Sequence, residues 1–216
     1  MSPGHEGREW ESHQDADRTI RRYFRELSKM VSQLPYTSIT RIVSIFLEAF
    51  AEQRTVYVFG NGGSAASASH LMCDITKGIS ETCPGIRPKV MALTDNASLM
   101  TAWANDFGYE RIFSEQLKTF IKPRDVAFAI STSGDSPNVL LALETAREYG
   151  AMTVGLGGCQ GGQMKSLCDV CAIVPSDNVQ LVEDLHQAMT HSIFIAVRQS
   201  LLTGTTKTLM ARAASF

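Results

Sequence analysis

The 216-residue sequence has no apolar run approaching the roughly 18 to 20 residues that a membrane-spanning helix needs. Its first fifteen residues are polar and lack the apolar stretch of a secretory signal peptide. Neither charge is in excess, because 20 Lys and Arg face 22 Asp and Glu, a formal net charge of −2 at pH 7. Such a balance gives no electrostatic footprint for nucleic acid or an anionic membrane. We therefore expect a cytoplasmic protein that contacts neither nucleic acid nor a membrane directly.

The sequence also lacks a disulfide framework. Its five cysteines are an odd number at irregular spacing, Cys73, Cys83, Cys159, Cys168 and Cys171, which indicates reduced thiols. Cys168 and Cys171 form a C-x-x-C pattern, but no second pair accompanies it and it falls in a predicted strand. We interpret that pair as structural.

Apolar runs and helical patterns alternate through most of the chain. Strands are predicted at 55–59, 89–93, 125–130, 151–156 and 170–174, with helices between them and a long last helix over 181–201. This alternation is typical of an α/β fold with a doubly wound, five-stranded parallel sheet. We expect one domain over residues 15–202, a disordered tail over 1–14 and a C-terminal tail over 203–216.

Two amphipathic helices precede the first strand, over 15–33 and about 38–53. Both cannot be buried in one layer of a small sheet. The apolar face of the helix that the sheet does not cover could form an interface between subunits, so the sequence predicts a homo-oligomer.

The first strand ends in the glycine loop, Gly60-Asn61-Gly62-Gly63-Ser64, and a helix of small residues follows. A strand, a tight glycine turn and a helix N-terminus present backbone N–H groups to an anion. The loop does not match G-x-G-x-x-G, because the third glycine position falls on Ala65, so dinucleotide binding is not expected. His70 and Asp74 stand four residues apart and share one face of the new helix. This combination favours an enzyme that acts on a phosphorylated small molecule.

The third strand ends in the serine loop, residues 131–136, which offers four hydroxyl groups, from Ser131, Thr132, Ser133 and Ser136. Hydroxyls and helix N-terminal amides can bind phosphate without Lys or Arg. The alternative is an ordinary capping cluster, with Ser136 as N-cap and Pro137 at the first helical position. Its pairing with a matching glycine loop favours phosphate binding.

A second polar group combines histidines and carboxylates: His70, Asp74, Glu183, His186 and His191. Such side chains bind a divalent metal such as Zn²⁺ or carry out acid–base chemistry. Glu183 and His191 are eight residues apart, about 12 Å along a straight helix and about 80° around it, so both reach one ion only if they lean together. The alternative for each histidine taken alone is a structural role.

Four motifs together resemble a known family. They are Gly60–Ser64, Thr101–Tyr109, Ser131–Val139 and the helix bearing Glu183 and His191, and they span roughly residues 15 to 202. In order and spacing they resemble the sugar isomerase (SIS) domain and, within it, the phosphoheptose isomerases that act on sedoheptulose 7-phosphate. The resemblance implies a flavodoxin-like three-layer sandwich, a homotetramer, and conversion of this ketose to D-glycero-D-manno-heptose 7-phosphate through an enediol.

The resemblance also implies roles for individual residues. The serine loop would hold the phosphate, whereas the sugar would be lined by Asn61, Gly62, Gly63, Ser64, Asp95, Asn96 and Glu183. One Zn²⁺ per subunit would be bound by His70, Asp74, Glu183 and His191. Asp74 would act as the catalytic base and His191 as its partner acid.

Two ligand positions depart from the family pattern, since Asp74 replaces a glutamate and Glu183 replaces a glutamine. The usual site arginine is also missing, and Lys77 is the nearest cation. A different substrate such as an amino-sugar phosphate is one alternative. Another is a non-catalytic protein that binds sugar phosphates or associates with the replication initiator. Retention of His70 and His191 favours the enzyme.

Overall fold

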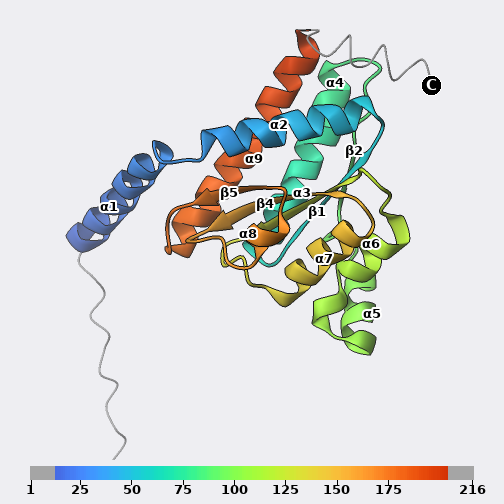
Figure 1. Cartoon of the computed structure of the whole chain (residues 1–216). Helices are drawn as coiled ribbons and strands as arrows, with labels where there is room; N and C mark the ends of the chain where they lie inside the picture. The colour runs from blue at the N-terminus through green and yellow to red at the C-terminus, as the bar shows by residue number, and fades with distance from the viewer. Residues whose placement is uncertain (1–12, 204–216) are drawn as a thin grey trace, which may run out of the picture.

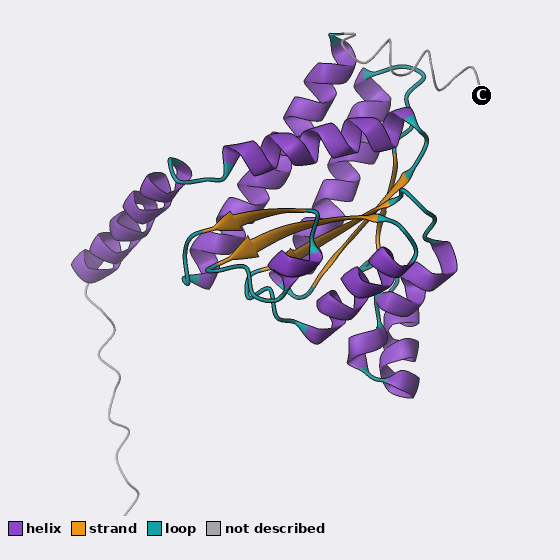
Figure 2. Ribbon diagram, in the orientation of Figure 1, coloured by secondary structure: helices purple, strands orange, loops and turns teal. Residues whose placement is uncertain are grey.

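The computed structural model describes residues 13–203, and its centre is a parallel sheet of five strands in the order β2-β1-β3-β4-β5 (Figures 1 and 2). The strands are β1 (Thr55–Gly60), β2 (Lys89–Ala92), β3 (Val126–Ser131), β4 (Met152–Gly158) and β5 (Val170–Val174). All neighbouring pairs are parallel, as the alternation of strands and helices predicts. The α/β fold with a doubly wound five-stranded sheet is thus confirmed, with strand ends displaced by two residues at most.

Helices cover both faces of the sheet, which explains why its central strands are apolar along their whole length. Every residue of β3 is buried. One face carries α2 (Tyr36–Ala51), α3 (Gly63–Cys73) and α9 (Val179–Leu202), and Phe46 of α2 meets Phe128 of β3 edge to face, with ring centroids 5.5 Å apart. The other face carries α6 (Ser114–Phe120), α7 (Pro137–Glu148) and the short α8 (Met164–Leu167). This is the three-layer arrangement that the resemblance implies.

Helix α1 (His13–Val31) extends away from this body (Figure 1). Ile20 and Phe24 on it are 55% and 62% exposed, whereas Leu27 and Met30, nearer its C-terminus, pack against the core of the body. The Tyr23 hydroxyl also donates a hydrogen bond of 2.5 Å to Asp184 Oδ2 on α9. The apolar stripe that the sequence predicts for this helix is therefore covered only in part within one chain, and Ile20, Phe24 and Val31 stay exposed. Most of the predicted tails, 1–14 and 203–216, lie outside the described residues.

Two helical boundaries differ from the sequence-based expectation. The residues Asn105-Asp106-Phe107-Gly108-Tyr109 are typical of a turn, but helix α5 (Ala97–Phe107) continues to Phe107. It ends at Gly108, whose φ of +100° favours glycine, and a 3-10 turn, η2 (Tyr109–Arg111), follows. The sequence after the glycine loop predicts a helix to about Lys77. Instead it widens at Asp74 into a π-helix, η1 (Asp74–Ile79), followed by the short α4 (Ser80–Thr82). π-turns often occur at functional sites.

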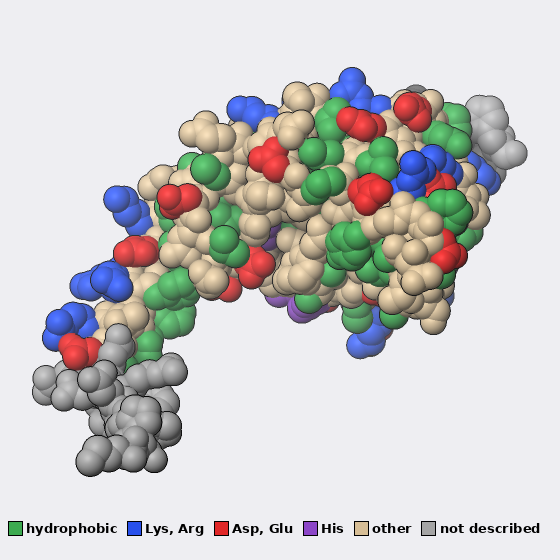
Figure 3. Space-filling view, turned by 90° about the horizontal axis from the view of Figure 1, so that it is seen from below, with side chains coloured by type: hydrophobic (Ala, Val, Ile, Leu, Met, Phe, Trp, Pro, Cys, Tyr) green, Lys and Arg blue, Asp and Glu red, His purple; other side chains and the backbone are tan. Residues whose placement is uncertain are grey.

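The surface carries no block of one charge on the face seen in Figure 3, where Lys and Arg are interspersed with Asp and Glu. Among residues 13–203, none of the helices combines the length and the hydropathy that crossing a membrane requires. All five cysteines are unpaired thiols, as their spacing predicts.

His186 joins α9 to the end of β4 and is 1% exposed. Its Nε2–H donates to the Gly157 carbonyl over 3.0 Å, and Nδ1 has no hydrogen-bond partner within the described part of the chain. Burial lowers the pKa of His186 to about 4, although the bond to Gly157 opposes that shift. The ring is therefore neutral and structural, so the structural alternative for this histidine is correct.

We expect this neutral ring to make the fold acid-sensitive. Because the folded pKa lies below the unfolded value, the contribution of His186 is complete above about pH 6.5 and is lost as the pH falls toward 4. At pH 5 the loss is about 2 kcal/mol. Urea unfolding of metal-free protein at pH 7 and pH 5 measures it. His186→Gln keeps a donor for Gly157 but does not titrate, so it should lose about 2 kcal/mol less between these pH values; equal losses would contradict the assignment.

Candidate functional site: two loops and a histidine–carboxylate group

The glycine loop, residues 60–64, connects β1 to α3 and depends on small residues. A Cβ on Gly60 would lie 2.5 Å from the Ile130 carbonyl oxygen and 2.8 Å from Ser64 Cβ, so only glycine fits there. Gly62 stands at the N-cap of α3 with a φ of +56°, in the left-handed region. The loop thus brings the N-terminus of α3 close to the end of β3.

The serine loop lies directly beside it, because β1 and β3 are neighbours in the sheet. The strand order reverses between these two strands, and ligands of open parallel sheets bind at such a switch point. Asn61 of the glycine loop and Asn138, in the first turn of α7 just after the serine loop, form two reciprocal side-chain hydrogen bonds of 2.9 and 2.8 Å. The Tyr109 hydroxyl donates to Asn61 Oδ1 over 3.1 Å. The side chain of Asn61 therefore holds the two loops together.

The hydroxyl groups of the serine loop are only partly used within the chain. Ser131 Oγ accepts from the Gly134 N–H over 3.1 Å, and Ser133 Oγ accepts from the Asp135 N–H over 3.2 Å. Both bonds use oxygen lone pairs and leave the hydroxyl protons available to an anion. Ser136 occupies the N-cap of α7 but makes no side-chain capping bond there. Its predicted position as the N-cap is confirmed, but its hydroxyl group does not hydrogen-bond to the helix.

The residues that follow β4 pack against the serine loop and hydrogen-bond to it. A Cβ on Gly134 would lie 2.1 Å from the Gly161 carbonyl oxygen, and the Met164 N–H donates to the Gly134 carbonyl over 2.9 Å. Asp135 Oδ1 accepts from the Gln163 N–H over 2.9 Å. The loop is thus preformed, which lowers the entropic cost of binding a ligand.

Asp95 and Asn96 lie beyond the end of β2, at an exposed turn. Asn96 Oδ1 caps α5 by accepting from the Leu99 N–H over 3.0 Å, a common role for asparagine at the start of a helix. Asp95 accepts from the hydroxyl of Ser69, on the α3 turn that carries His70. Asp95 therefore connects the β2 turn to the helix that presents the histidine.

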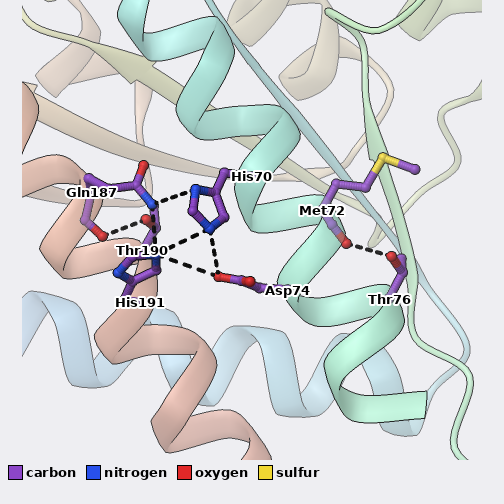
Figure 4. Close-up of polar contacts among 7 residues, drawn as sticks. All are labelled: His70, Met72, Asp74, Thr76, Gln187, Thr190 and His191. Carbon is purple, nitrogen blue, oxygen red and sulfur yellow. Dashed lines mark hydrogen bonds and ion pairs between the residues drawn. The ribbon is translucent and has the colours of Figure 1, made fainter. Parts of the chain in front are cut away.

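His70, Asp74 and His191 converge where α3 and η1 meet α9 (Figure 4). Asp74 Oδ2 lies 3.6 Å from His70 Nε2 and 3.7 Å from His191 Nε2, and the two Nε2 atoms are 3.4 Å apart. The rings are 49% and 44% exposed and the carboxylate 23%, and Figure 3 shows histidine side chains reaching the surface. A substrate can therefore reach the group.

These three atoms form a nearly equilateral triangle, which permits a test of fit to a metal. Ligands held at 2.0–2.1 Å around a tetrahedral Zn²⁺ are separated by about 3.3 Å. The observed separations of 3.4, 3.6 and 3.7 Å are close to that value. Two imidazoles and one carboxylate also form a ligand set of catalytic zinc sites, which keep a fourth position open. The group fits a zinc ion.

Glu183 does not join this triangle. The side chains of the described residues that converge closely enough to hold a metal are His70, Asp74 and His191. The carboxylate of Glu183 instead lies against Gly63 at the start of α3, with Oε1 2.6 Å from the position of an added Cβ. Its predicted place beside the sugar accords with this position, whereas its role as a metal ligand stays a prediction.

Gln187 contacts the group, although no sequence motif singles it out. Its side-chain nitrogen lies 3.2 Å from His70 Nδ1 and 2.9 Å from His191 Nε2. The one available signal was its position four residues before His191, on the same face of α9. That signal is weak, because any α9 residue at this spacing shares it.

Comparison with known proteins identifies the family. The SIS-domain profile matches residues 21–158. The phosphoheptose isomerase of Trichlorobacter lovleyi is 38% identical over 173 residues, which cover 80% of this chain and 87% of that protein. The phosphoheptose isomerase of Rhodospirillum rubrum is 43% identical over 143 residues, which cover 66% of this chain and 74% of that protein.

Solved structures agree with the sequence matches. The phosphoheptose isomerase of Neisseria gonorrhoeae superposes with a TM-score of 0.79 at 25% identity, over 85% of this chain and 99% of that one. The enzyme of Francisella tularensis gives 0.80 at 26% identity, over 85% of this chain and 98% of that one. With its two loops at the switch point and its histidine–carboxylate group between α3 and α9, the chain belongs to the SIS-domain family and, within it, to the phosphoheptose isomerases.

Proposed function

We propose that this protein converts sedoheptulose 7-phosphate into D-glycero-D-manno-heptose 7-phosphate. The observation that carries the proposal is that one helix, α3, connects the two loops to the histidine–carboxylate group. Helix α3 begins in the glycine loop, beside the serine loop, and His70 lies seven residues after Gly63, about 10 Å along its axis. An extended seven-carbon sugar with its phosphate on the last carbon has a comparable length, so it can bind the loop and reach the histidines at once.

The phosphate end is assigned to the serine loop, with donors from Ser131, Thr132, Ser133 and Ser136. The first turn of α7 adds backbone N–H groups and its positive dipole end. We assign the contacts to the sugar hydroxyls to Asn61, Gly62, Gly63, Ser64, Asp95, Asn96 and Glu183. Because the side chain of Asn61 is paired with Asn138, its contribution to the sugar is through the loop that it holds in place.

The reacting end is assigned to His70, Asp74 and His191, which we propose bind one Zn²⁺ per subunit. When bound, such an ion would supply Lewis-acid polarisation of the substrate carbonyl group. Since Asp74 Oδ2 faces the two imidazoles, we assign to Oδ1 the transfer of a proton from C1 to C2. His191 is the partner that moves the hydroxyl proton. Together these transfers convert ketose to aldose through an enediol.

We further propose that the protein works as a cytoplasmic homotetramer. A phosphorylated sugar is an intracellular metabolite, which supports the location. The exposed stripe of Ile20 and Phe24 on α1 supports self-association, because exposed apolar surface of this kind marks interaction sites.

Asp74→Asn should abolish the proposed reaction, since an amide cannot accept the C1 proton. We expect kcat to fall by about 10²–10⁴-fold. The assay supplies sedoheptulose 7-phosphate with added zinc and follows the aldose product by NMR and mass spectrometry. Absence of product from the unaltered protein, with or without zinc, would refute the isomerase assignment and leave the non-catalytic alternative.

Ser136→Ala should weaken phosphate binding without unfolding the protein. Because this hydroxyl makes no capping bond, Tm should change little, in contrast to the usual N-cap serine. Loss of one hydrogen bond to a charged phosphate predicts a KM about ten-fold higher. The matched control is Ser192→Ala on a different helix, α9, where the Ser192 hydroxyl donates to the Met189 carbonyl. An unchanged KM would remove Ser136 from the phosphate site.

Phe24→Asp should dissociate the tetramer, because a charge cannot be buried against an apolar partner surface without a large cost. Light scattering after size-exclusion chromatography measures the mass of both proteins. The exposed Tyr149→Asp is a control on α7's C-terminal side, away from α1. If the Phe24 variant keeps the mass of the parent, α1 is not the interface.

A further inference from the structure

Two cysteines that the proposed reaction does not use lie together on the face of the sheet that α7 and α8 cover. Cys168 connects α8 to β5, and Cys171 lies within β5, paired in register with Gly155 of β4. A Cβ on Gly155 would lie 2.9 Å from Cys168 Sγ and 3.2 Å from Cys171 Sγ. Both sulfur atoms therefore occupy the space that a side chain at position 155 would fill.

A bend in the chain brings the two thiols to the same side of the sheet. In an unbent strand, residues three apart point to opposite faces. The chain bends at Asp169, whose N–H donates to the Thr153 carbonyl over 2.9 Å and whose Oδ2 accepts from the Thr153 N–H over 2.8 Å. Thr153 is fully buried, so these bonds fix the bend. The C-x-x-C spacing thus becomes a pair of neighbouring sulfur atoms, which the sequence alone does not indicate.

The surroundings of the two thiols distinguish a nucleophile from its partner. The pKa of Cys171 is lowered because Cys168 donates a hydrogen bond to it and the ammonium group of Lys165 is near, although burial opposes this shift. The pKa of Cys168 is raised by the same hydrogen bond, by burial and by the charge of Asp169, against the guanidinium of Arg147. Because the thiolate is the nucleophilic form of cysteine, Cys171 is the sulfur that reacts first.

Both thiols are half-buried, so a small molecule can reach them, whereas Cys83 is only 5% exposed. Cysteines that respond to oxidants combine a lowered pKa, access for the oxidant and a second thiol close by. Cys168 and Cys171 together meet these three conditions.

Helix α8 connects the thiol pair to the serine loop. At its start, the Met164 N–H donates to the Gly134 carbonyl over 2.9 Å, and at its end the Cys168 N–H donates to the Met164 carbonyl over 3.1 Å. The methyl group of Met164 also lies 3.3 Å from the Cβ position of Gly155, beside the two sulfur atoms. A movement of Cys168 therefore moves the residue that hydrogen-bonds to the serine loop.

We propose that Cys168 and Cys171 form a reversible modification site: a peroxide oxidises the two thiols to a disulfide, and the disulfide loosens the contact of α8 with the serine loop. Bonded sulfur atoms lie about 2.05 Å apart, well inside the separation of two thiols in contact. Bond formation therefore draws Cys168 toward Cys171 and pulls on the end of α8. In a reducing compartment such a bond is transient, as expected of a redox-sensing pair.

The oxidation takes place in two steps. The Cys171 thiolate attacks one oxygen of hydrogen peroxide, the O–O bond breaks, and Cys171 becomes a sulfenic acid while hydroxide leaves and is protonated to water. The Cys168 sulfur then attacks the Cys171 sulfur, the S–O bond breaks, and the hydroxyl group leaves as water with the Cys168 proton. Two electrons pass from the thiols to the peroxide, and a thiol reductant reverses the reaction.

The first test is chemical and uses the full-length protein, reduced and then treated with hydrogen peroxide. Trypsin cleaves after Lys165 and Arg198, so Cys168 and Cys171 share one peptide that contains no other cysteine. We expect mass spectrometry to show that this peptide loses two hydrogen atoms and regains them with dithiothreitol. Absence of that loss at a peroxide concentration that oxidises the exposed Cys73 would overturn the proposal.

Serine variants distinguish the two thiols, since serine is close to cysteine in size. In Cys168→Ser the new hydroxyl group can still donate to Cys171, so we expect a sulfenic acid at Cys171 that a dimedone probe labels. Cys171→Ser removes the nucleophile, so labelling of Cys168 should be about ten-fold slower or more. Equal labelling in the two variants, or faster labelling of Cys168, would overturn the assignment.

Hydrogen–deuterium exchange tests the connection to the serine loop without any ligand or metal. We expect the Met164 amide to exchange about ten-fold faster in the oxidised parent than in the reduced parent, as loss of one backbone hydrogen bond predicts. Cys171→Ser treated with the same peroxide is the matched control, because it meets the oxidant but cannot form the bond. Unchanged exchange in the oxidised parent would overturn the proposal, as would an equal change in the control. None of these measurements depends on turnover, so this proposal and the isomerase assignment fail independently.

Discussion

The reversal of strand order between β1 and β3 is the constraint on which the site depends. It places two neighbouring carboxyl ends at the same edge with their following helices on opposite faces of the sheet, so a crevice opens between the loops. The Asn61–Asn138 pair then fixes the distance between the loops with two amide hydrogen bonds. The two loops bring backbone N–H groups and hydroxyl groups to this crevice, and such groups can bind phosphate without a cation.

Helix α3 links that edge of the sheet to the histidine–carboxylate group. Gly60 lets its N-terminus approach β3, and the rigid helix then carries His70 to a fixed distance from the loops. Helix α9 contributes His191 to the same group and Glu183 to the glycine loop, two turns apart. The packing of these two helices against the apolar sheet therefore fixes the distances between the loops and the histidine–carboxylate group.

The parts that the sequence predicts well are those encoded locally. The five strands, the loops at the ends of β1 and β3, and the caps at Asn96 and Ser136 follow from apolar runs, glycines and small polar residues close together in the chain. His70 and Asp74 could be paired because they share a helix. The contacts of Glu183 and Gln187 could not, since both depend on how α9 is rotated against α3. The π-turn at Asp74 and the hydrogen bonds of Asn61 to Asn138 likewise arise from tertiary packing. The local sequence at those positions does not indicate either feature.

The shorter carboxylate at position 74 illustrates how packing can offset a change of side-chain length. Aspartate reaches one methylene less far than the glutamate of the family pattern, yet Oδ2 is nearly equidistant from His70 Nε2 and His191 Nε2, at 3.6 and 3.7 Å. The backbone widens into a π-turn from this residue onward, so the helix itself is altered where the side chain is shortened. A protein that had lost both metal binding and catalysis would not be expected to keep three donor atoms at the separations that zinc ligands have. The geometry at Asp74 therefore favours an active enzyme over a binding module that has lost its chemistry.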